Sequence, residues 1–399
     1  MTEQRSLSRR LIQIFNRYLE PGGEETWVAN LENSFNLPTC YFNSSDWTGP
    51  NAPSQLGQAL RMIDNPASLQ RLWQLQEKEN AEAWIVQNAF PTGSAAIYHE
   101  AEKLGMPLIQ YVHNFRPFSI SGYLQTADLD MLPNRLQTYL TEIKRASWQD
   151  SHLKTAWFAI VLSIAHLLGW FKAITAWIAV SDFMRNQFIR IGVPAEKIFT
   201  LRHFWTPTTD IGASADNGYY LFIGRLVEMK GILTLLESWD LIWQEKRNAA
   251  PRLEIIGDGP LAETVRESAC KNSLVKLRGT VFGEAKQELL RGARALIAPS
   301  ICLESLGLVV YEAYDFAKPV LASRAGALAE IVTHGVTGLI HEPGNARMLC
   351  EQVMSLEREK DTRLAFGRNG RQWLLSNTNE EAWRKRFNEI VELAIATKQ

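Results

Sequence analysis

Cysteine is scarce in this sequence, and its cysteines do not occur in closely spaced pairs. The four cysteines, Cys40, Cys270, Cys302 and Cys350, are widely separated, and no two stand in a C-x-x-C spacing. Neither a disulfide framework nor a zinc site is therefore indicated. The chain opens on the polar stretch MTEQRSLSRR and not on an apolar leader, which predicts a cytoplasmic protein.

An excess of charge of one sign is also absent. Lys and Arg total 42 against 43 for Asp and Glu, a net charge of -1 at pH 7. This balance argues against sequence-independent binding of nucleic acid, which needs a basic surplus. The HExxH, GxSxG and GxxxxGK[ST] motifs are missing, which disfavours zinc peptidases, serine hydrolases and P-loop enzymes.

Long apolar runs are rare. The strongest, AWFAIVLSIAHLLGWF at 156–171, has 16 residues and contains Ser163 and His166. A membrane-spanning helix needs roughly 20 apolar residues. We expect a buried core helix, with an interfacial membrane-docking helix and a true span as the open alternatives.

What the sequence does contain is an alternation of short apolar runs and longer amphipathic ones. Such an alternation predicts βαβ units and parallel sheets. Because a typical domain has about 150 residues, a chain of 399 residues suggests two or three domains. The runs expected as strands are 11–15, 83–87, 107–112 and 176–180, then 219–224, 252–257, 274–279, 293–300 and 319–323.

A stretch without periodicity, HFWTPTTDIGASADNG at 203–218, separates the two series and predicts an interdomain linker. The fold class is therefore α/β, with two doubly wound parallel-sheet domains at 1–205 and 206–378. The segment 379–399 has one apolar helical face and is expected to return to the first domain. Because ligands bind beyond the carboxyl ends of parallel strands, we expect the site in the cleft between the domains.

Two strand-to-helix turns of the first half carry polar or glycine-rich sequences. After the first strand, Pro21, Gly22 and Gly23 precede a helix, where free backbone N–H groups attract anions. A later buried strand runs directly into His113, Asn114 and Arg116. From these stretches alone, a plain surface turn at the glycines stays open as an alternative, and a lone histidine is more often a structural residue.

Two turns of the second half carry charge. Gly224 ends one strand, Arg225 follows it directly, and Lys230 precedes the next helix, so two cations suited to a diphosphate lie close in sequence. After 293–300, Glu304 is followed by Gly307 and then by Glu312. If a helix starts near Leu308, its first N–H groups can hold an anion. A capping glutamate and a solvated mid-helix glutamate are the structural alternatives.

These four turns, in this order, resemble the retaining nucleotide-sugar glycosyltransferases of family 4, which have the GT-B fold of two facing Rossmann-like domains. Glu304 and Glu312 match the E-x7-E motif of that family, and FIGRLVEMKG and EPGGEE are similar to its donor-binding segments. The resemblance covers nearly the whole chain and is strongest over 219–345. The chain departs from the usual pattern at Gln87, His203, Lys318 and Ala327.

The resemblance implies a role for each matching residue. In the second half, Arg225 and Lys230 would bind the donor diphosphate, and Glu304 would lie beside the reacting carbon. Glu312 would bond the ribose hydroxyls. The backbone of Gly307, Leu308 and Val309 would hold sugar or phosphate, and the base would rest near Gly279 to Val281. In the first half, Gly22 and Gly23 would close over the diphosphate, and His113 would contact the sugar.

The resemblance also implies the reaction: a retaining transfer of a hexose-type sugar from a nucleoside-diphosphate sugar to a hydroxyl acceptor. Because no DxD-like acidic pair stands at the end of a predicted strand in either half, we expect the transfer to be metal-independent. The acceptor would be a glycan, a lipid-linked molecule or a small molecule. No cofactor, metal or nucleic-acid partner is expected, and peripheral association with the inner face of a membrane stays open. The alternatives are a nucleotide-sugar epimerase and a non-catalytic sugar-nucleotide-binding protein of the same fold.

Overall fold

The computed structural model describes residues 7–19, 22–124, 128, 132–211, 216–246 and 250–398. The chain divides into two compact units. Unit 1 comprises Met1–His203 and Glu381–Gln399, and unit 2 comprises Phe204–Glu380. The described part of the predicted linker has no helix or strand, and its residues 212–215 lie outside the described residues.

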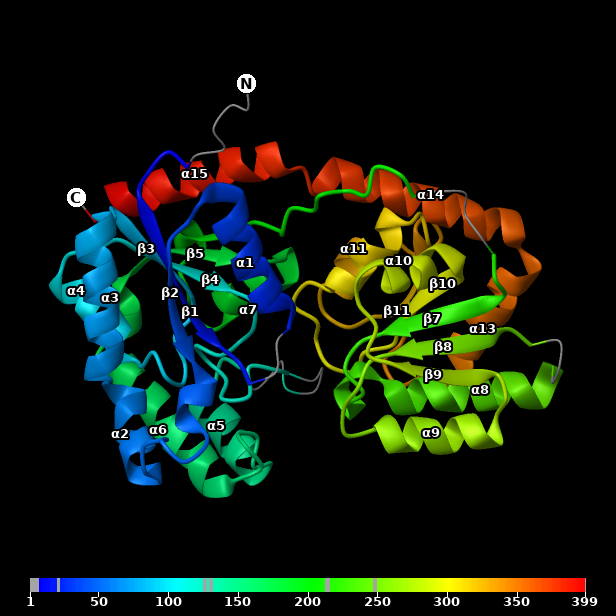
Figure 1. The fold of residues 1–399 in the computed structure, drawn as a ribbon, viewed down its shortest axis with the longest axis horizontal. Coiled ribbons are helices and arrows are strands. Elements are labelled where there is room, and N and C mark those ends of the chain that lie inside the picture. The colour runs from blue at the N-terminus through cyan, green and yellow to red at the C-terminus, as the bar shows by residue number, and fades with distance from the viewer. Residues whose placement is uncertain are drawn as a thin grey trace. The chain divides into compact units, whose positions relative to one another are not determined.

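Unit 1 is built on a six-stranded parallel sheet in the order β2-β1-β3-β4-β5-β6 (Figure 1). The order reverses direction between β1 and β3, as in doubly wound folds. Its strands are β1 (Leu11–Arg17), β2 (Thr39–Asn43), β3 (Ala83–Asn88), β4 (Leu108–Val112), β5 (Ile174–Ala179) and β6 (Ile198–Thr200). Its helices are α1 (Gly23–Phe35), η1 (Ser44–Trp47), α2 (Gln55–Ile63), α3 (Pro66–Glu79), α4 (Ala96–Lys103), α5 (Arg135–Lys144), α6 (His152–Leu167), η3 (Trp170–Ala173), α7 (Asp182–Arg190), η4 (Ala195–Lys197) and α15 (Glu380–Ala396).

Unit 2 contains a second six-stranded parallel sheet, in the order β12-β11-β10-β7-β8-β9. Counted within the unit, this is the 3-2-1-4-5-6 order of dinucleotide-binding domains. Its strands are β7 (Tyr219–Ile223), β8 (Arg252–Ile256), β9 (Val275–Gly279), β10 (Ala293–Ala298), β11 (Val320–Ser323) and β12 (Gly338–His341). Its helices are η5 (Glu228–Lys230), α8 (Ile232–Lys246), α9 (Ala262–Lys271), α10 (Gly283–Gly292), α11 (Leu308–Asp315), α12 (Leu328–Ile331), α13 (Ala346–Arg358) and α14 (Lys360–Asn377).

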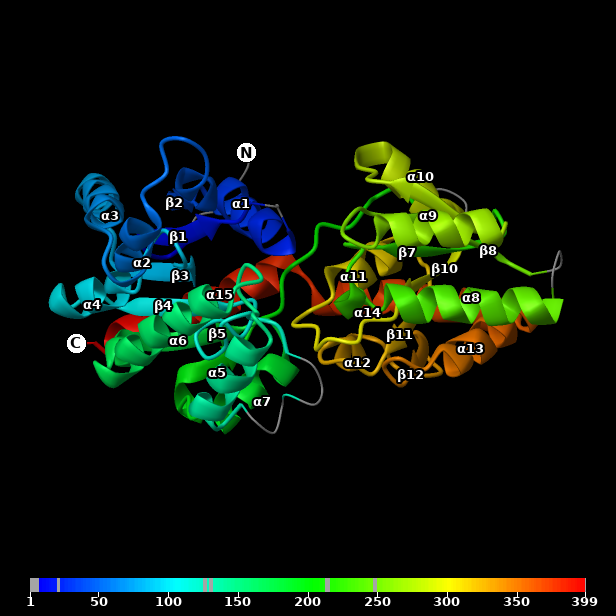
Figure 2. The same cartoon turned by 90° about the horizontal axis from the view of Figure 1, so that it is seen from below.

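Both faces of the second sheet are buried. Along β7, Tyr220 and Phe222 join a core that includes apolar side chains of α8 and α13, and α8 packs on α13. Leu221 lies between them in sequence, is completely buried and points to the opposite face, since side chains alternate along a strand. Figure 2 shows α8 and α13 in unit 2 from below. The predicted α/β fold class with doubly wound parallel sheets is confirmed.

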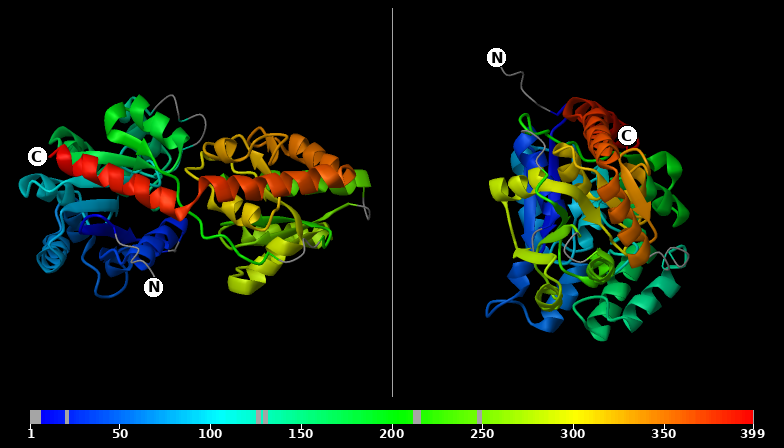
Figure 3. Two further views of the ribbon diagram at one scale, coloured as in Figure 1. Left: turned by 90° about the horizontal axis from the view of Figure 1, so that it is seen from above. Right: turned by 90° about the vertical axis from the view of Figure 1, so that its right-hand side faces the viewer.

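The last helix, α15, packs on unit 1. Trp383 stacks on Phe35 at a centroid distance of 5.5 Å and meets Trp27 edge-on, also at 5.5 Å. Arg9 forms an ion pair with Glu392 at 2.8 Å. Figure 3 shows α15 along unit 1 and α14 along unit 2. The buried side chains of α15 are those of the predicted apolar face: Trp383, Phe387, Ile390, Val391 and Ala394.

Gly231 allows two backbone segments to approach closely at the carboxyl end of the second sheet. It has a φ of 74°, and a Cβ atom there would lie 2.0 Å from the carbonyl oxygen of Pro299. The carbonyl of Met229 accepts hydrogen bonds from the N–H groups of Ile301 (2.9 Å) and Cys302 (3.2 Å). The segment after β7 is thereby fixed against the loop after β10.

We predict that Gly231→Ala lowers the stability of unit 2 by roughly 2 to 5 kcal/mol, because a left-handed backbone and a steric clash add. Gly335→Ala is the matched control: its φ is 75°, and no atom lies within 4 Å of the added Cβ. The control should lose only about 1 to 2 kcal/mol. Urea unfolding measures both, and equal losses would contradict the role given to the Pro299 contact.

Candidate functional site

The neighbouring strands β7 and β10 end at the point where the strand order of unit 2 reverses. In sheets of this kind a ligand binds beyond the carboxyl ends of the strands at that point. Gly224 and Arg225 follow β7, and Ser300 and Glu304 follow β10. The structure therefore places the predicted charged turns at the carboxyl ends of these two central strands, where a ligand is expected.

Lys230 and Glu304 form an ion pair at this edge. The Lys230 Nζ lies 2.6 Å from Oε1 of Glu304, and the Ser300 hydroxyl donates to the same oxygen at 2.5 Å. Burial raises the pKa of Glu304, but the charge of Lys230 and the two hydrogen bonds lower it more, so the pKa lies below its ordinary value of 4.5. The carboxylate is ionised at neutral pH.

The backbone of Glu304 is held by a second glycine contact. Glu304 and Gly326 form a parallel bridge, and the Ala327 N–H donates to the Glu304 carbonyl at 2.9 Å. Gly326 has a φ of 63°, and a Cβ atom there would lie 2.4 Å from that carbonyl oxygen. This glycine is retained although Ala327 replaces the glycine that the resemblance leads one to expect after it.

Arg225 is exposed and lies near the same pair. The charges of Arg225, Lys230 and Glu304 all act on the thiol of Cys302, whose pKa burial raises to about 12. Electrostatic effects of this kind act between neighbouring groups. The structure therefore brings together three of the four charged residues that the sequence singles out in this half.

The fourth, Glu312, has a partner that the sequence analysis missed. Lys286 of α10 donates to its Oε1 at 2.7 Å, while its Oε2 is buried without a hydrogen-bond partner. Lys286 and Glu312 are 26 positions apart. No local pattern predicts a contact over that separation.

The helix that carries Glu312 begins as predicted. Gly307 is its N-cap in the left-handed region at φ 87°, and α11 starts at Leu308. The N–H groups of Leu308 and Val309 belong to the first turn, where the helix itself supplies no acceptor. Val281 lies two residues after the end of β9, and its neighbour Phe282 is 78% exposed. Phe282 was not among the predicted site residues.

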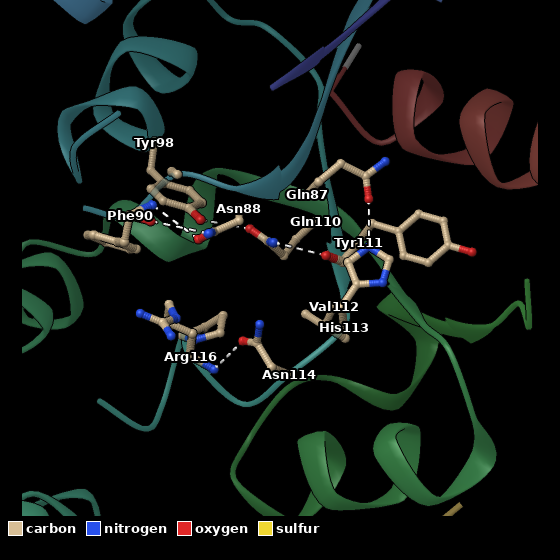
Figure 4. Close-up of a pocket in the computed structure, with 12 residues that line it drawn as sticks. Gln87, Asn88, Phe90, Tyr98, Gln110, Tyr111, Val112, His113, Asn114 and Arg116 are labelled. Atoms are coloured by element: carbon tan, nitrogen blue, oxygen red, sulfur yellow. Dashed lines mark hydrogen bonds between the residues drawn. The ribbon is translucent and has the colours of Figure 1, made fainter. Parts of the chain in front are cut away.

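His113 lies in unit 1, where it lines a pocket at the ends of β3 and β4 (Figure 4). Its Nε2 lies 2.7 Å from Oε1 of Gln87, and its ring stacks on Tyr111 at 4.9 Å. Burial lowers the pKa of His113 to about 3, so its ring is neutral. The position predicted from the sequence is both packed like a structural histidine and adjacent to a pocket.

Gly22 and Gly23 are also in unit 1. Gly22 is the N-cap of α1, which begins at Gly23, and Pro21 lies outside the described residues. Glu24 in the first turn accepts hydrogen bonds from the Tyr18 hydroxyl (2.9 Å) and the Asn114 amide (3.3 Å). Burial raises the pKa of Glu24 to about 7. Glu24 was not among the predicted site residues, because nothing in its local sequence pattern indicates burial.

The apolar helix predicted at 156–171 is α6 (His152–Leu167). One face is buried and includes Phe158, Val161 and Leu162, as expected of a core helix. Leu153, Ile160 and Leu167 are 81%, 46% and 86% exposed. Among the described residues, no helix has the length and apolar character needed to cross a bilayer.

Comparison with known proteins agrees with this architecture. The whole chain has the GT-B fold: it matches sucrose-phosphate synthase from Thermosynechococcus elongatus with a TM-score of 0.69 at 16% identity, over 97% of this chain and 100% of that one. It matches Anabaena HepE in complex with UDP-glucose with a TM-score of 0.66 at 16% identity, over 96% of this chain and 99% of that one.

Family models match both halves. Residues 49–204 match Glycosyltransferase Family 4, and residues 209–373 match Glycosyl transferases group 1. The chain belongs to this glycosyltransferase family, which confirms the resemblance.

The curated relatives match over part of their length. A glycosyltransferase of Methanocaldococcus jannaschii is 30% identical over 160 residues, 40% of this chain and 43% of the relative. The GDP-mannose-dependent alpha-(1-6)-phosphatidylinositol monomannoside mannosyltransferase of Mycobacterium tuberculosis is 31% identical over 161 residues, 38% of this chain and 41% of the relative. The chain thus spans about two fifths of the length of these relatives.

We predict that Lys230→Met raises the pKa of Glu304 above its ordinary value of 4.5, because burial then acts without the opposing charge. In the unchanged protein the ionised pair stabilises the fold at pH values above 4.5, the ordinary pKa of a glutamate. This stabilisation is lost as the pH falls through the lowered pKa of Glu304. Carbon NMR of the glutamate carboxyl groups measures the shift. Lys286→Met is the control and should leave the Glu304 titration in place; an unmoved Glu304 in Lys230→Met would refute the assignment.

Proposed function

We propose that the chain is a retaining glycosyltransferase that moves a hexose-type sugar from a nucleoside-diphosphate sugar to a hydroxyl acceptor. The observation that carries this proposal is the Lys230–Glu304 pair beside the start of α11, at the edge where β7 and β10 end. Family membership supports it. So do the complexes of HepE with UDP and UDP-glucose and the GDP-mannose dependence of the mycobacterial relative.

Lys230 can serve two anions at once in this proposal. Its ammonium group has three donors, and Glu304 and a phosphate oxygen can each accept one. Arg225 adds a planar fork suited to phosphate oxygens, and the N–H groups of Leu308 and Val309 add the positive end of a helix. Together these groups stabilise the diphosphate as it leaves, which is where negative charge develops.

Glu304 acts at the other end of the breaking bond. Positive charge develops at the anomeric carbon, and the ionised carboxylate of Glu304 lies beside it. Retention follows when the acceptor hydroxyl approaches from the face of the departing diphosphate. The acceptor oxygen bonds to the carbon, the bond from carbon to phosphate oxygen breaks, and the departing oxygen takes the hydroxyl proton.

The remaining assignments concern the nucleotide and the sugar. Glu312, already fixed by Lys286, would accept hydrogen bonds from the ribose hydroxyls. The base would rest near Gly279 to Val281, where the exposed ring of Phe282 offers a stacking surface. Gly22 and Gly23 would approach the diphosphate, and neutral His113 would contact the sugar.

A turnover assay with a panel of nucleotide sugars tests the proposal. We expect release of nucleoside diphosphate that depends on an acceptor and is unchanged by EDTA, because the side-chain cations supply the charge that a divalent ion would supply. Lys230→Ala should weaken binding of the nucleoside diphosphate at least tenfold. Glu304→Ala should lower kcat far more than donor affinity.

Other outcomes identify the alternatives. Interconversion of nucleotide sugars without transfer would indicate an epimerase, and donor binding without any turnover would indicate a sensor. Equal losses of kcat and donor affinity in Glu304→Ala would contradict the placement of Glu304 at the sugar. Collapse of the fold in Lys230→Ala would make the role of that residue structural.

An apolar face of unit 1 supports peripheral binding to an anionic membrane as part of this proposal. Leu153, Ile160 and Leu167 recur every seven residues, so they form one stripe along α6. α6 packs on both α2 and α5, and these two helices expose further leucines (Figure 1). Apolar side chains bordered by exposed lysines favour a surface of anionic lipids. The lysines are Lys144, Lys154 and Lys172.

We expect the chain to sediment with vesicles that contain phosphatidylglycerol and not with pure phosphatidylcholine vesicles. The double variant Leu153→Ser, Leu167→Ser should lose most of this binding, because it removes two exposed apolar side chains that would enter the lipid. It should still fold, because exposed side chains contribute little to folding. Leu104→Ser, at an exposed leucine that ends α4, is the control and should bind as the unchanged protein does. Equal binding by all three proteins would exclude the α6 stripe as the docking surface.

A further inference from the structure

Arg116 in unit 1 is a buried cation whose donors are not all satisfied. Only 7% of the residue is exposed, and its Nε and Nη1 atoms are buried without a hydrogen-bond partner. Its Nη2 reaches the Ser121 carbonyl only at 3.4 Å. Among the described residues, no carboxylate lies within ion-pair distance of its guanidinium group. Each unsatisfied donor costs free energy, and an unpaired buried charge costs more.

The surroundings of Arg116 hold the guanidinium group in place without neutralising it. Its central carbon lies 4.9 Å from the ring centre of Trp148 and 5.9 Å from that of Tyr18. The Arg116 N–H donates to Oδ1 of Asn114 at 2.9 Å. Aromatic rings and a fixed backbone position a guanidinium group, but they do not accept the hydrogen bonds that its unpaired N–H groups offer.

Arg116 also lines the pocket that contains His113. Asn88, Phe90 and Asn114 line the same pocket, and Figure 4 shows Asn114 between Arg116 and His113. The pocket lies at the carboxyl ends of β3 and β4, beside the point where the strand order of unit 1 reverses. A ligand is therefore expected at this edge of the sheet on topology alone.

Glu24, the acidic residue linked to Arg116 through Asn114, does not repel a bound anion. Glu24 shares Asn114 with Arg116, and burial raises the pKa of Glu24 to about 7, even with the opposing effect of the Arg116 charge. Close to neutral pH the Glu24 carboxyl group is therefore substantially protonated. Its other oxygen, Oε1, is buried and without a partner.

We propose that Arg116 binds an oxyanion of the acceptor substrate, a phosphate or a carboxylate, in this pocket. An oxyanion supplies the acceptors and the negative charge that Arg116 lacks, and arginine binds both groups through charge-assisted hydrogen bonds. The inference rests on the proposed function and narrows it, because the donor diphosphate is assigned to Arg225 and Lys230 in unit 2. The acceptor is then an anionic molecule and not a neutral glycan.

The test uses the full chain with three probes of similar size: glucose 6-phosphate, glucuronate and glucose. At millimolar concentration, one or both anions should raise the melting temperature while glucose does not, since a ligand that binds only the folded state stabilises it. The two anionic probes distinguish a phosphate from a carboxylate. Arg116→Met should weaken the binding of the anions at least tenfold and leave UDP binding unchanged.

Two controls separate ligand binding from a structural role. Arg71→Met removes an exposed arginine of α3 in the same unit and should keep the response to the anions. Without probes, Arg116→Met should melt no lower than the unchanged protein, because methionine fills the aromatic surroundings and relieves an unpaired buried charge. Destabilisation of the probe-free variant would indicate a structural arginine and overturn the inference.

The remaining outcomes are equally distinct. A chain that turns over nucleotide sugars but responds to neither anion would overturn the inference and leave the proposed function standing. Equal loss of UDP and anion binding in Arg116→Met would assign Arg116 to the donor and overturn the inference as well. Anion binding that depends on Arg116 in a chain without any turnover would uphold the anion site and refute the proposed function.

Discussion

The contact between Gly231 and the carbonyl of Pro299 is the constraint on which the rest of the site in unit 2 depends. It lets the segment after β7 lie directly on the loop after β10, where Met229 accepts two backbone hydrogen bonds. In that position the Lys230 Nζ lies 2.6 Å from Oε1 of Glu304. Gly326 approaches Glu304 from the other side, so two residues without side chains fix one cation and one carboxylate at the end of the sheet.

Glu304 in unit 2 and Glu24 in unit 1 are both buried carboxylates, but they differ in whether a cation lies beside them. In unit 2 each candidate carboxylate has a lysine at hydrogen-bond distance, which keeps Glu304 ionised. In unit 1 Glu24 has no cation within ion-pair distance among the described residues, and its pKa rises. A fixed cation and carboxylate can stabilise the opposite charges that develop when a bond breaks. A buried cation without a carboxylate partner, such as Arg116, can instead bind an anionic ligand.

The sequence predicted the interior of both sheets and the start of α11, and the reason lies in burial. β1, β3, β4 and β5 are covered on both faces, so each shows as an apolar run. The strands that were not predicted, β2, β6 and β12, lie at sheet edges, and in β2 and β6 most side chains are only partly buried. Likewise the charged turns could be located, but their partners could not. Lys286 and Glu312 meet only through the packing of α10 and α11, and the missing partners of Arg116 are a property of its surroundings.

The placement of α15 has a consequence for biosynthesis. Unit 2 is one continuous segment, whereas unit 1 needs residues from both ends of the chain. While the chain leaves the ribosome, Trp27 and Phe35 have no Trp383 to cover them until α15 has been synthesised, after the whole of unit 2. The second unit can therefore complete its core first. The first unit, although most of it is synthesised earlier, cannot complete its core until α15 is present, and part of its apolar surface stays exposed to water or to a chaperone until then.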